Sequence, residues 1–160
     1  MNQNAVGTER DVLIDAVLTA SRVLVAIAAR SLADAGEAVT LTQYRALVVL
    51  ASRGPQSLAA LAEALAVTSP TASRMCERLV RKGLVRRRAD RTDRRQVRIV
   101  LSKAGRSLID AVTENRRREI AALLDSISPE DRPALVASLR HLAEGAGEVP
   151  EQDWSSGWRL

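Results

Sequence analysis

The sequence predicts a mainly α-helical protein of the α+β class, in which a helix-turn-helix motif and a two-stranded β-hairpin form one domain. Three observations within Leu58 to Gly105 predict it. They are a short helix with apolar periodicity, a second helix after about three residues, and a hairpin with a charged loop. A hairpin that directly follows a helix-turn-helix motif is typical of a winged helix-turn-helix domain.

The two helices of the motif each have one apolar face. In the first, Ser57 is a good N-cap for a short apolar run. In the second, Ser69 is expected to be the N-cap and Pro70 the first helical residue, a position whose N–H needs no partner. The apolar residues recur at helical spacing, namely Leu58, Leu61, Ala62 and Leu65 in the first helix and Ala72, Met75, Cys76, Leu79 and Val80 in the second.

The hairpin follows Gly83. Two runs with β-branched residues, Leu84–Arg88 and Gln96–Leu101, predict its strands, and the loop between them consists almost entirely of Arg, Asp and Thr. Side chains alternate along a strand, so Arg86, Arg87 and Arg88 are not expected to face one partner together.

Positive charge is concentrated in this part of the chain. From Thr68 to Arg106 there are thirteen Lys and Arg residues and three Asp and Glu residues, a balance of +10, whereas the whole chain carries +5. The remaining residues therefore carry −5. A basic helix beside an arginine-rich hairpin favours binding to double-stranded DNA, with the helix in the major groove. The alternative is a solvated charged face on an ordinary helical domain.

Two helices precede the motif and two follow the hairpin. The first helix runs from Thr8 to about Leu32 and ends at Gly36; Thr42 is expected to cap the second, which Gly54-Pro55 stops. After the hairpin, Ser102 caps a helix to about Asp125. A last helix opens at Ser128–Asp131 and ends near Gly145.

The polar run Asn115–Glu119 interrupts the apolar stripe of the helix that follows the hairpin. Such a run is either a solvated face or a second contact to phosphates.

The outer helices have apolar stripes that the central domain is too small to cover. A homodimer in which these helices interleave is the economical solution, and a monomeric helical bundle is the alternative. We expect four segments: an N-terminal dimerisation helix (1–36), the winged helix-turn-helix domain (37–105), C-terminal dimerisation helices (106–147) and a tail (148–160). The tail holds Trp154 and Trp158 and is expected to dock on a groove of its own or the partner subunit.

Several classes of function lack the residues that they need. No Ser-His-acid arrangement, Gly-rich phosphate loop or paired carboxylates point to an enzyme, and no cofactor is expected. His141 is the single histidine, so no metal site is expected, and Cys76 is expected to be a buried core residue. We expect no secretory signal and no stretch that approaches a membrane span, which predicts a cytoplasmic protein.

These residues together resemble the MarR family of bacterial winged-helix transcription factors. The resemblance is strong over Leu41–Gly105. Its most specific part is the hairpin, where Asp93 and Arg95 match the family's Asp-x-Arg pair and Gly105 matches its closing Gly. Ser102 stands where Thr is commoner. The resemblance implies a homodimer whose two recognition helices lie about one helical turn apart on a pseudo-palindromic duplex.

The expected DNA contacts lie in the second helix of the motif and in the hairpin loop. Arg74 is the strongest candidate because Arg reads guanine bidentately, and a phosphate clamp or an intramolecular pair is the alternative. Arg94 is expected to enter the minor groove, whereas Asp93 and Arg95 hold the loop by similarity to the family. The full expected set is Ser69, Pro70, Thr71, Ser73, Arg74, Arg78, Arg91, Arg94 and Arg95. Arg78 and Arg81 are expected to touch the DNA backbone or to pair with Glu77.

The resemblance also implies a small-molecule effector in a crevice between the dimerisation layer and the winged domain. By analogy of fold, its polar groups are Tyr44 with Arg22 or Arg45. The predicted function is a homodimeric repressor that occupies an inverted repeat and is released by the effector. The alternatives are an architectural DNA-binding protein of low specificity and a winged-helix adaptor that binds proteins.

Overall fold

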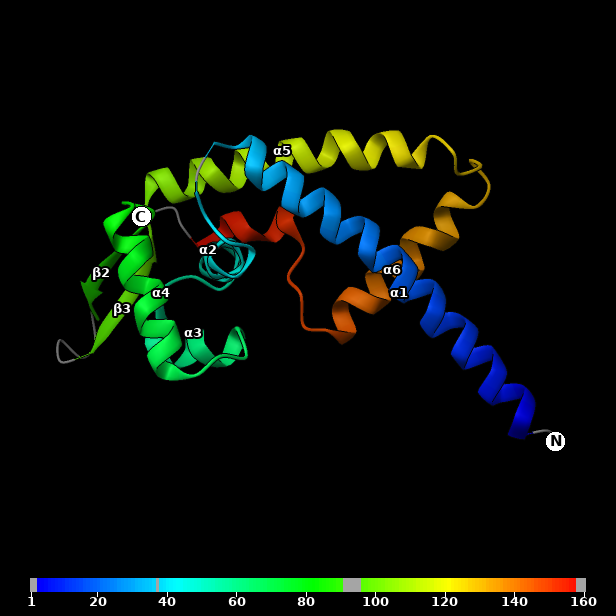
Figure 1. Cartoon of the computed structure of the whole chain (residues 1–160), viewed down its shortest axis with the longest axis horizontal. Helices are drawn as coiled ribbons and strands as arrows, with labels where there is room; N and C mark the ends of the chain where they lie inside the picture. Colours follow the sequence, from blue (N-terminus) through cyan, green and yellow to red (C-terminus); the bar gives the residue numbers. More distant parts are fainter. Residues whose placement is uncertain (1–2, 37, 91–95, 158–160) are drawn as a thin grey trace.

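The computed structural model describes residues 3–36, 38–90 and 96–157. Three helices extend to one side of a small winged unit (Figure 1): α1 (Gln3–Asp34), α5 (Lys103–Leu124) and α6 (Arg132–Gly145). In Figure 1, α5 runs from the winged unit across the whole molecule, and α1 extends away toward the N-terminus on the far side. The mainly α class with a small antiparallel sheet is therefore confirmed.

The winged unit contains the helices α2 (Leu41–Arg53), α3 (Leu58–Ala64) and α4 (Ser69–Arg81) and the strands β1 (Gln56–Ser57), β2 (Val85–Ala89) and β3 (Val97–Leu101). The strands form an antiparallel sheet in the order β1-β3-β2. The hairpin β2–β3 was predicted, but β1 was not. Its two residues pair with Ile99 and Arg98 of β3. A strand this short has no measurable periodicity, and only the tertiary position of β3 gives it a partner.

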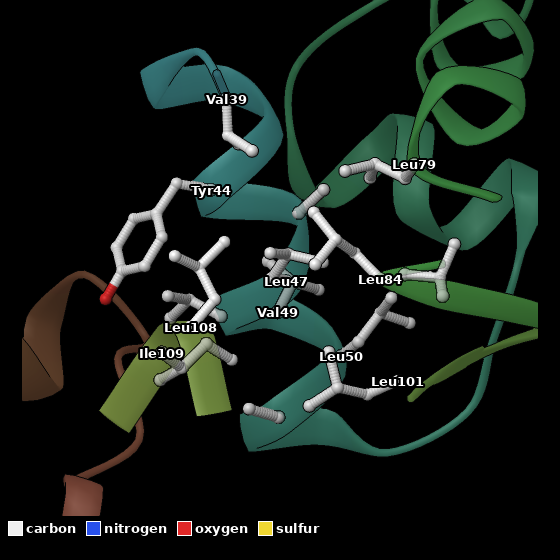
Figure 2. Close-up of a cluster of buried hydrophobic side chains, with 14 of the residues drawn as sticks. Val39, Tyr44, Leu47, Val49, Leu50, Leu79, Leu84, Leu101, Leu108 and Ile109 are labelled. Atoms are coloured by element: carbon white, nitrogen blue, oxygen red, sulfur yellow. The ribbon is translucent and has the colours of Figure 1, made fainter. Parts of the chain in front are cut away.

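The core lies where α2 meets α4, the sheet and the first half of α5 (Figure 2). Leu47 and Leu50 of α2 are fully buried, as are Leu79 of α4 and Ile109 of α5. With aromatic residues at 2% of the sequence, this core is almost entirely aliphatic, and Tyr44 lies at its edge. The helix-turn-helix motif is thus held against a close-packed base that fixes its orientation.

The start of α2 differs from the prediction. Its N-cap is Thr40 and not Thr42. Thr40 Oγ1 accepts a hydrogen bond from the Gln43 backbone N–H (3.2 Å), and Gln43 Oε1 accepts one from the Thr40 N–H (3.1 Å). This reciprocal capping box satisfies two N–H groups at once, which a cap at Thr42 would not do. The predicted N-caps of α3 and α5, Ser57 and Ser102, are both confirmed.

The start of α5 is tied to the end of α4. Ser102 Oγ accepts a hydrogen bond from the Gly105 N–H (3.0 Å) and donates one to the Gly83 carbonyl (2.6 Å). The Ser102 N–H also donates to the Leu84 carbonyl (3.1 Å). Gly105 is buried against this turn, and a Cβ on it would overlap the Leu84 carbonyl oxygen and lie 2.7 Å from Leu101 Cδ1. A side chain larger than hydrogen does not fit at this junction.

The polar run Asn115–Glu119 is a solvated face in part, because Arg117 and Arg118 are exposed, but it also makes contacts that were not predicted. Glu119 Oε2 accepts hydrogen bonds from Arg30 Nε (3.0 Å) and Nη2 (2.6 Å) of α1, and Asn115 Nδ2 donates to the Ser31 carbonyl (3.3 Å). Arg117 binds the C-terminal segment instead. The run is therefore a partly exposed junction between α5, α1 and the tail. Sequence periodicity could not reveal it, because the partners are more than 80 residues away for α1.

A layer of exposed apolar side chains covers α1, the end of α5 and α6. Examples are Leu13 (64% exposed), Leu139 (51%) and Leu142 (57%). In α6, no residue is buried within its own chain. We call α1, the second half of α5 and α6 the outer layer. Its apolar surface is the feature from which the sequence predicted a homodimer.

Within the described residues, one helix is long and apolar enough to cross a membrane by length and composition: Gly7–Asp34 of α1, which contains an 18-residue window with a mean hydropathy of 2.0. The expectation that no stretch approaches a membrane span is therefore wrong for α1. Asp15 and Arg22 interrupt the run of apolar residues, but the mean hydropathy of the 18-residue window remains high. A helix that packs against other helices has the same composition, so this property alone does not assign α1 to a membrane.

The described part of the tail folds back on its own chain. A short 3-10 helix, η1 (Glu151–Gly157), lies beside α2. Trp154 is half-buried against the core, and its Nε1 donates to the Val149 carbonyl at 2.8 Å. Trp158, the other tryptophan of the predicted tail, lies outside the described residues.

Candidate nucleic-acid interface

The helix α4 begins one residue earlier than predicted. Thr68 is its N-cap, Ser69 is the first helical residue and Pro70 follows in the first turn. Thr68 makes no side-chain cap hydrogen bond, and its Oγ1 lies 3.0 Å from Thr71 Oγ1 instead. Thr68 has an extended backbone, and Ser69, the residue before Pro70, is already helical. The first turn thus presents three exposed hydroxyl groups, those of Thr68, Ser69 and Thr71.

The outward face of α4 carries most of the expected contact residues. Ser69, Pro70, Thr71, Arg74 and Arg78 are all exposed, while Ala72, Met75, Cys76 and Leu79 are buried on the opposite face. Val80, which was expected on the buried face, is 37% exposed. The helix therefore separates a basic, hydroxyl-bearing face from an apolar one, which is the division that a helix inserted in the major groove needs.

A groove of about 370 Å³ lies between the start of α2 and the outward face of α4. Its walls are Thr40, Thr42 and Gln43 from α2 and Thr71, Arg74, Met75 and Arg78 from α4. Two guanidinium groups and several hydroxyl groups thus face one hollow, and α2 contributes residues that the sequence did not single out. The sequence could not reveal this groove, because residues such as Thr42 and Arg78 are far apart in the chain and meet only in the folded structure.

Glu77, the acid of α4, has a different partner from the one predicted. Its carboxylate accepts a hydrogen bond from Ser73 Oγ (3.2 Å), and Arg87 Nη2 of β2 lies 4.0 Å from Glu77 Oε1. The predicted partners Arg78 and Arg81 are instead exposed at the surface. Ser73 is half-buried and already bonded, so of the predicted contact residues in α4 it is the least accessible.

The strand β2 is an edge strand, because β3 lies between it and β1. Arg86, Arg87 and Arg88 are exposed, although they alternate between the two faces of the strand. The sheet is too small to cover either face of its edge strand. Arg87 Nη2 lies 4.0 Å from Glu77 Oε1 of α4. All three arginine side chains are thus exposed on the edge strand of the wing.

The loop of the hairpin, residues 91–95, lies outside the described residues, and with it Arg91, Asp93, Arg94 and Arg95. The described base of the hairpin has an ion pair that the sequence analysis missed. Arg98 Nε donates to Asp90 Oδ2 at 2.5 Å, and the Asp90 N–H donates to the Gln96 carbonyl at 2.8 Å. Arg98 is paired across the sheet with Arg88, so Asp90 is its diagonal neighbour. An acid and a base on either side of the loop were a usable signal, because diagonal neighbours in an antiparallel hairpin are within reach of long side chains.

Neither the cysteine nor the acids of the described residues suggest redox or metal chemistry. Burial raises the pKa of the Cys76 thiol, which keeps it protonated and weakly nucleophilic. In the part of the chain that the structure describes, no three His, Cys, Asp or Glu residues are grouped so that they could hold a metal ion.

The three residues expected in an effector pocket lie in different environments. Arg22 is exposed on α1, where its Nη2 donates to Thr19 Oγ1 at 3.1 Å. Arg45 is paired with Glu148 of the tail. Tyr44 is buried, and burial raises its pKa, while hydrogen bonds with Thr113 and Arg116 of α5 lower it in part.

Thr113 and Arg116 line a cavity of about 210 Å³ that Glu151 and Trp154 of the tail also line. Arg116 Nε is buried there, without a hydrogen-bond partner among the described residues. None of the three predicted residues, Tyr44, Arg22 and Arg45, is among the residues that line this cavity. Tyr44 reaches it only indirectly, through its hydrogen bonds with Thr113 and Arg116.

Known proteins are similar to this chain in sequence and in fold. Residues 39–97 match the MarR family. The HTH-type transcriptional repressor NicR of Pseudomonas putida is 32% identical over 106 residues, which cover 66% of this chain and 67% of NicR. The crystal structure of RV1404 from Mycobacterium tuberculosis is 44% identical, with a TM-score of 0.81 over 88% of this chain and 95% of that chain.

A further solved structure concerns the regulation of DNA binding of Bordetella bronchiseptica BpsR by 6-hydroxynicotinic acid. It is 26% identical, with a TM-score of 0.59, and the match covers 81% of this chain and 91% of BpsR. The domain match, the identity to NicR and RV1404 and the winged helix-turn-helix architecture agree. The chain therefore belongs to the MarR family of winged helix-turn-helix transcriptional regulators, and not to a family of enzymes.

Proposed function

We propose that this chain is a cytoplasmic repressor that binds a pseudo-palindromic DNA operator as a homodimer and is released by a small-molecule effector. The observation that carries the proposal is the combination of two surfaces on opposite parts of one chain. One is the basic outward face of α4 with the arginines of β2, and the other is the apolar surface of the outer layer.

The basic surface supports binding to DNA. In α4, Arg74 and Arg78 are exposed beside the hydroxyl groups of Ser69 and Thr71, a set that can contact both base edges and phosphates. The backbone N–H groups in the first turn of α4 add the positive end of the helix dipole. A protein–protein adaptor would not need this concentration of arginine.

The apolar surface supports a homodimer. Exposed apolar side chains on α1, α5 and α6 are contiguous in the chain's outer layer, and leaving them in water is unfavourable. A two-fold symmetric dimer formed through this surface would carry two α4 helices, as a two-fold symmetric operator requires.

The effector part of the proposal rests on the cavity beside Tyr44 and on BpsR. The cavity is lined by Arg116 and Arg117, by the apolar Ile120 and Trp154, and by the Glu151 carboxylate, which is paired with Arg117. The buried Arg116 Nε has no hydrogen-bond partner among the described residues, and we infer that it can bind the carboxylate of a small ring compound. The DNA binding of BpsR is regulated by 6-hydroxynicotinic acid, a compound of this type. We therefore infer that an aromatic carboxylate of this size is the first class of effector to test.

The test is a fluorescence-anisotropy titration of the purified protein with two duplexes, one from upstream of its own coding region and one scrambled. It is carried out at low and at near-physiological salt. We expect the upstream duplex to bind at least about a hundredfold more tightly than the scrambled one. A salt dependence that corresponds to roughly 6–10 neutralised phosphates is expected as well.

Each other outcome has a definite meaning. Equal affinity for both duplexes would support the architectural alternative, and a genome-wide binding selection would then search for another operator. No binding to either duplex would overturn the DNA-binding proposal. Addition of 6-hydroxynicotinic acid to the preformed complex tests the effector, and an unchanged anisotropy would exclude this compound.

A further inference from the structure

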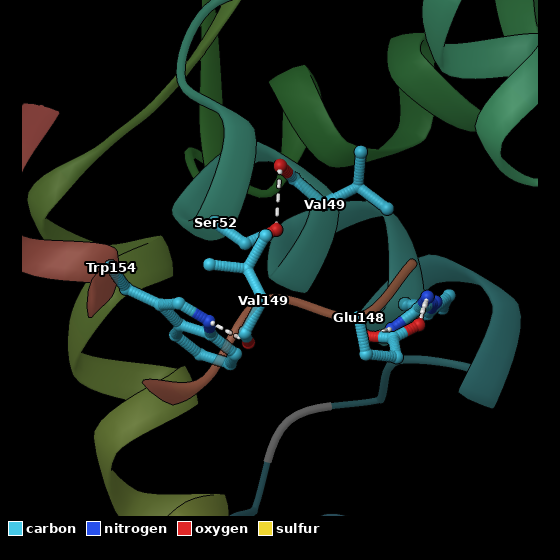
Figure 3. Close-up of polar contacts among 6 residues, drawn as sticks. Val49, Ser52, Glu148, Val149 and Trp154 are labelled. Carbon is cyan, nitrogen blue, oxygen red and sulfur yellow. Dashed lines mark hydrogen bonds and ion pairs between the residues drawn. The ribbon is translucent and has the colours of Figure 1, made fainter. Parts of the chain in front are cut away.

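The C-terminal segment Glu148–Trp154, which we call the tail strap, contacts α2 and α5 at the same time. At its beginning, the Arg45 guanidinium of α2 donates two hydrogen bonds to the Glu148 carboxylate (Figure 3). Farther along, Arg117 Nη2 of α5 donates to Glu151 Oε2 at 2.9 Å. The strap therefore joins the first helix of the winged unit to the middle of the long helix that leaves it.

Trp154 anchors the end of the strap. Its ring is half-buried against the hydrophobic core, and its Nε1 donates to the Val149 carbonyl within the strap itself (Figure 3). The one polar atom of the indole is thus satisfied, and the ring can pack without an unpaired donor. Docking of the strap therefore combines ion pairs with the burial of a large apolar side chain.

The strap reaches α5 at the junction of the two parts of the molecule. The buried residues of α5 that belong to the winged core end at Val112. Beyond Val112, Asn115 and Glu119 contact α1, and the helix continues to the exposed Leu123 and Leu124. Arg117 lies in this second stretch. Contacts made by the strap thus cross the boundary between the winged unit and the outer layer.

The strap also connects the end of α6 back to α2. It follows α6 directly, and no residue of α6 is buried within its own chain. Through the pair of Glu148 with Arg45, the end of α6 is connected to α2. The winged unit is therefore attached to the outer layer by the continuous helix α5, by the end of α1, whose Leu32 packs into the core, and by the returning strap. The strap adds a restriction on the relative rotation of the two parts to those of α1 and α5.

We propose that the tail strap holds the winged unit in the orientation in which the dimer binds its operator, and that undocking the strap weakens DNA binding. The proposal rests on the proposed function of the chain as a dimeric DNA-binding regulator. When the strap is undocked, the winged unit samples more orientations relative to the outer layer. The apparent affinity for DNA then falls in proportion to the fraction of molecules whose winged unit is in the orientation that binds DNA.

Charge exchange at the pair of Arg45 and Glu148 tests the proposal. Glu148→Arg places two guanidinium groups against each other and should undock the start of the strap. Arg45→Glu combined with Glu148→Arg restores an ion pair without changing the net charge. Glu144→Arg is the matched control, because Glu144 is exposed, lies four residues before Glu148 and gives the same change of charge.

We expect Glu148→Arg to weaken operator binding about fivefold or more relative to Glu144→Arg, the lower range of an allosteric coupling. The double exchange should return the affinity to within about twofold of the parent. Trp154→Ala, which leaves every charge in place, should weaken binding like Glu148→Arg. Far-ultraviolet circular dichroism and sedimentation check that each variant is folded and dimeric.

A second readout follows the strap itself. In a Trp158→Phe background Trp154 is the only tryptophan, and its emission reports whether the indole is packed or in water. We expect a red shift and greater quenching by acrylamide in Glu148→Arg, and a return toward the parent in the double exchange.

The outcomes separate the two proposals. If the parent binds the operator and Glu148→Arg and Trp154→Ala bind like Glu144→Arg, the strap proposal is overturned and the proposed function stands. The strap proposal also fails if Trp154 is undocked but the affinity is unchanged. If the parent binds no duplex, the proposed function fails, and the strap proposal fails with it.

Discussion

Gly105 is required by space and not by backbone conformation. It lies in the first turn of α5, where the Leu84 carbonyl oxygen and Leu101 occupy the volume that a Cβ would need. The backbone around Leu84 is also fixed, because its carbonyl accepts the Ser102 N–H. The glycine that matches the end of the MarR wing pattern therefore has a physical reason in this chain.

We expect Gly105→Ala to destabilise the protein by about 1–3 kcal/mol, the usual effect of overpacking a well-packed site. The measurement is a urea titration followed by circular dichroism. Gly145→Ala is the control, because a Cβ at Gly145 meets nothing within 4 Å and that residue also lies in a helix. Equal unfolding midpoints for the two variants would mean that the junction can relax around a methyl group.

Arg74 is the residue of α4 on which specific binding should depend most. It is exposed, and it lines the groove between α4 and the start of α2 together with Thr71 and Arg78. Arg74→Ala should reduce operator affinity by about 1–3 kcal/mol if it reads a base and should relax the preference at one position of the operator. Arg10→Ala, an exposed arginine near the start of α1, is the control.

Affinities of Arg74→Ala for operator variants distinguish base reading from phosphate contact. A uniform loss over all sequences, with a shallower salt dependence, would identify Arg74 as a phosphate contact. Parent-like affinity would remove Arg74 from the interface.

At the scale of elements, the starts of helices depend on local pairs of residues. Ser57 and Ser102 cap their helices as predicted, because each accepts a hydrogen bond from the N–H three residues later. At α2, two threonine residues compete, and the reciprocal bonds between Thr40 and Gln43 decide the choice. The sequence pattern Thr-x-x-Gln contained this information.

The tail strap gives a prediction of pH dependence. The Arg45 guanidinium, through its hydrogen bonds, holds the pKa of the Glu148 carboxyl below its ordinary value. A carboxyl with a lowered pKa in the folded state stabilises the docked strap above its ordinary pKa, and this contribution is lost as the pH falls through the lowered value. Because Glu148 is 41% exposed, solvent screening keeps the effect small.

We therefore expect the Trp154 emission of the Trp158→Phe protein to shift toward that of exposed indole as the solution is acidified from neutral pH. In Glu148→Gln, this acid-dependent step should be absent, and the emission at neutral pH should already resemble the acid form in part. An identical acid transition in Glu148→Gln would assign the step to another group.

At the scale of the whole molecule, the outer layer leaves many apolar side chains exposed in a single chain. The helix α1 extends beyond the winged unit (Figure 1). Many apolar side chains of α1 are exposed, and α6 buries none of its residues within the chain. The helix α1 is long and apolar enough to cross a membrane. A helix that packs against a second subunit needs the same length and the same apolar composition.

Leu13→Glu and Leu142→Glu should each shift the protein from dimer toward monomer, because a carboxylate buried between two helices without a partner is strongly unfavourable. Sedimentation velocity measures the change. Ala59→Glu introduces the same charge on the exposed side of α3 and should leave the dimer intact. A parent that sediments as a monomer at micromolar concentration would contradict the homodimer.

The sequence by itself determined the elements that depend on neighbouring residues. The apolar periodicity of α4, the caps Ser57 and Ser102 and the alternating strands of the hairpin predicted the winged helix-turn-helix and the charge of its exposed face. These features follow from interactions within a few residues along the chain, which a sequence shows directly.

Only the tertiary structure decided the features that join distant residues. It gave β1 its partner strand, assigned Glu77 to Arg87 and Asp90 to Arg98, and turned the run Asn115–Glu119 into a junction with α1 and the tail. It also brought Arg45 and Glu148 together across 103 positions. A charge or a hydroxyl has many suitable partners in a sequence, and only packing selects which of them lies within hydrogen-bond distance.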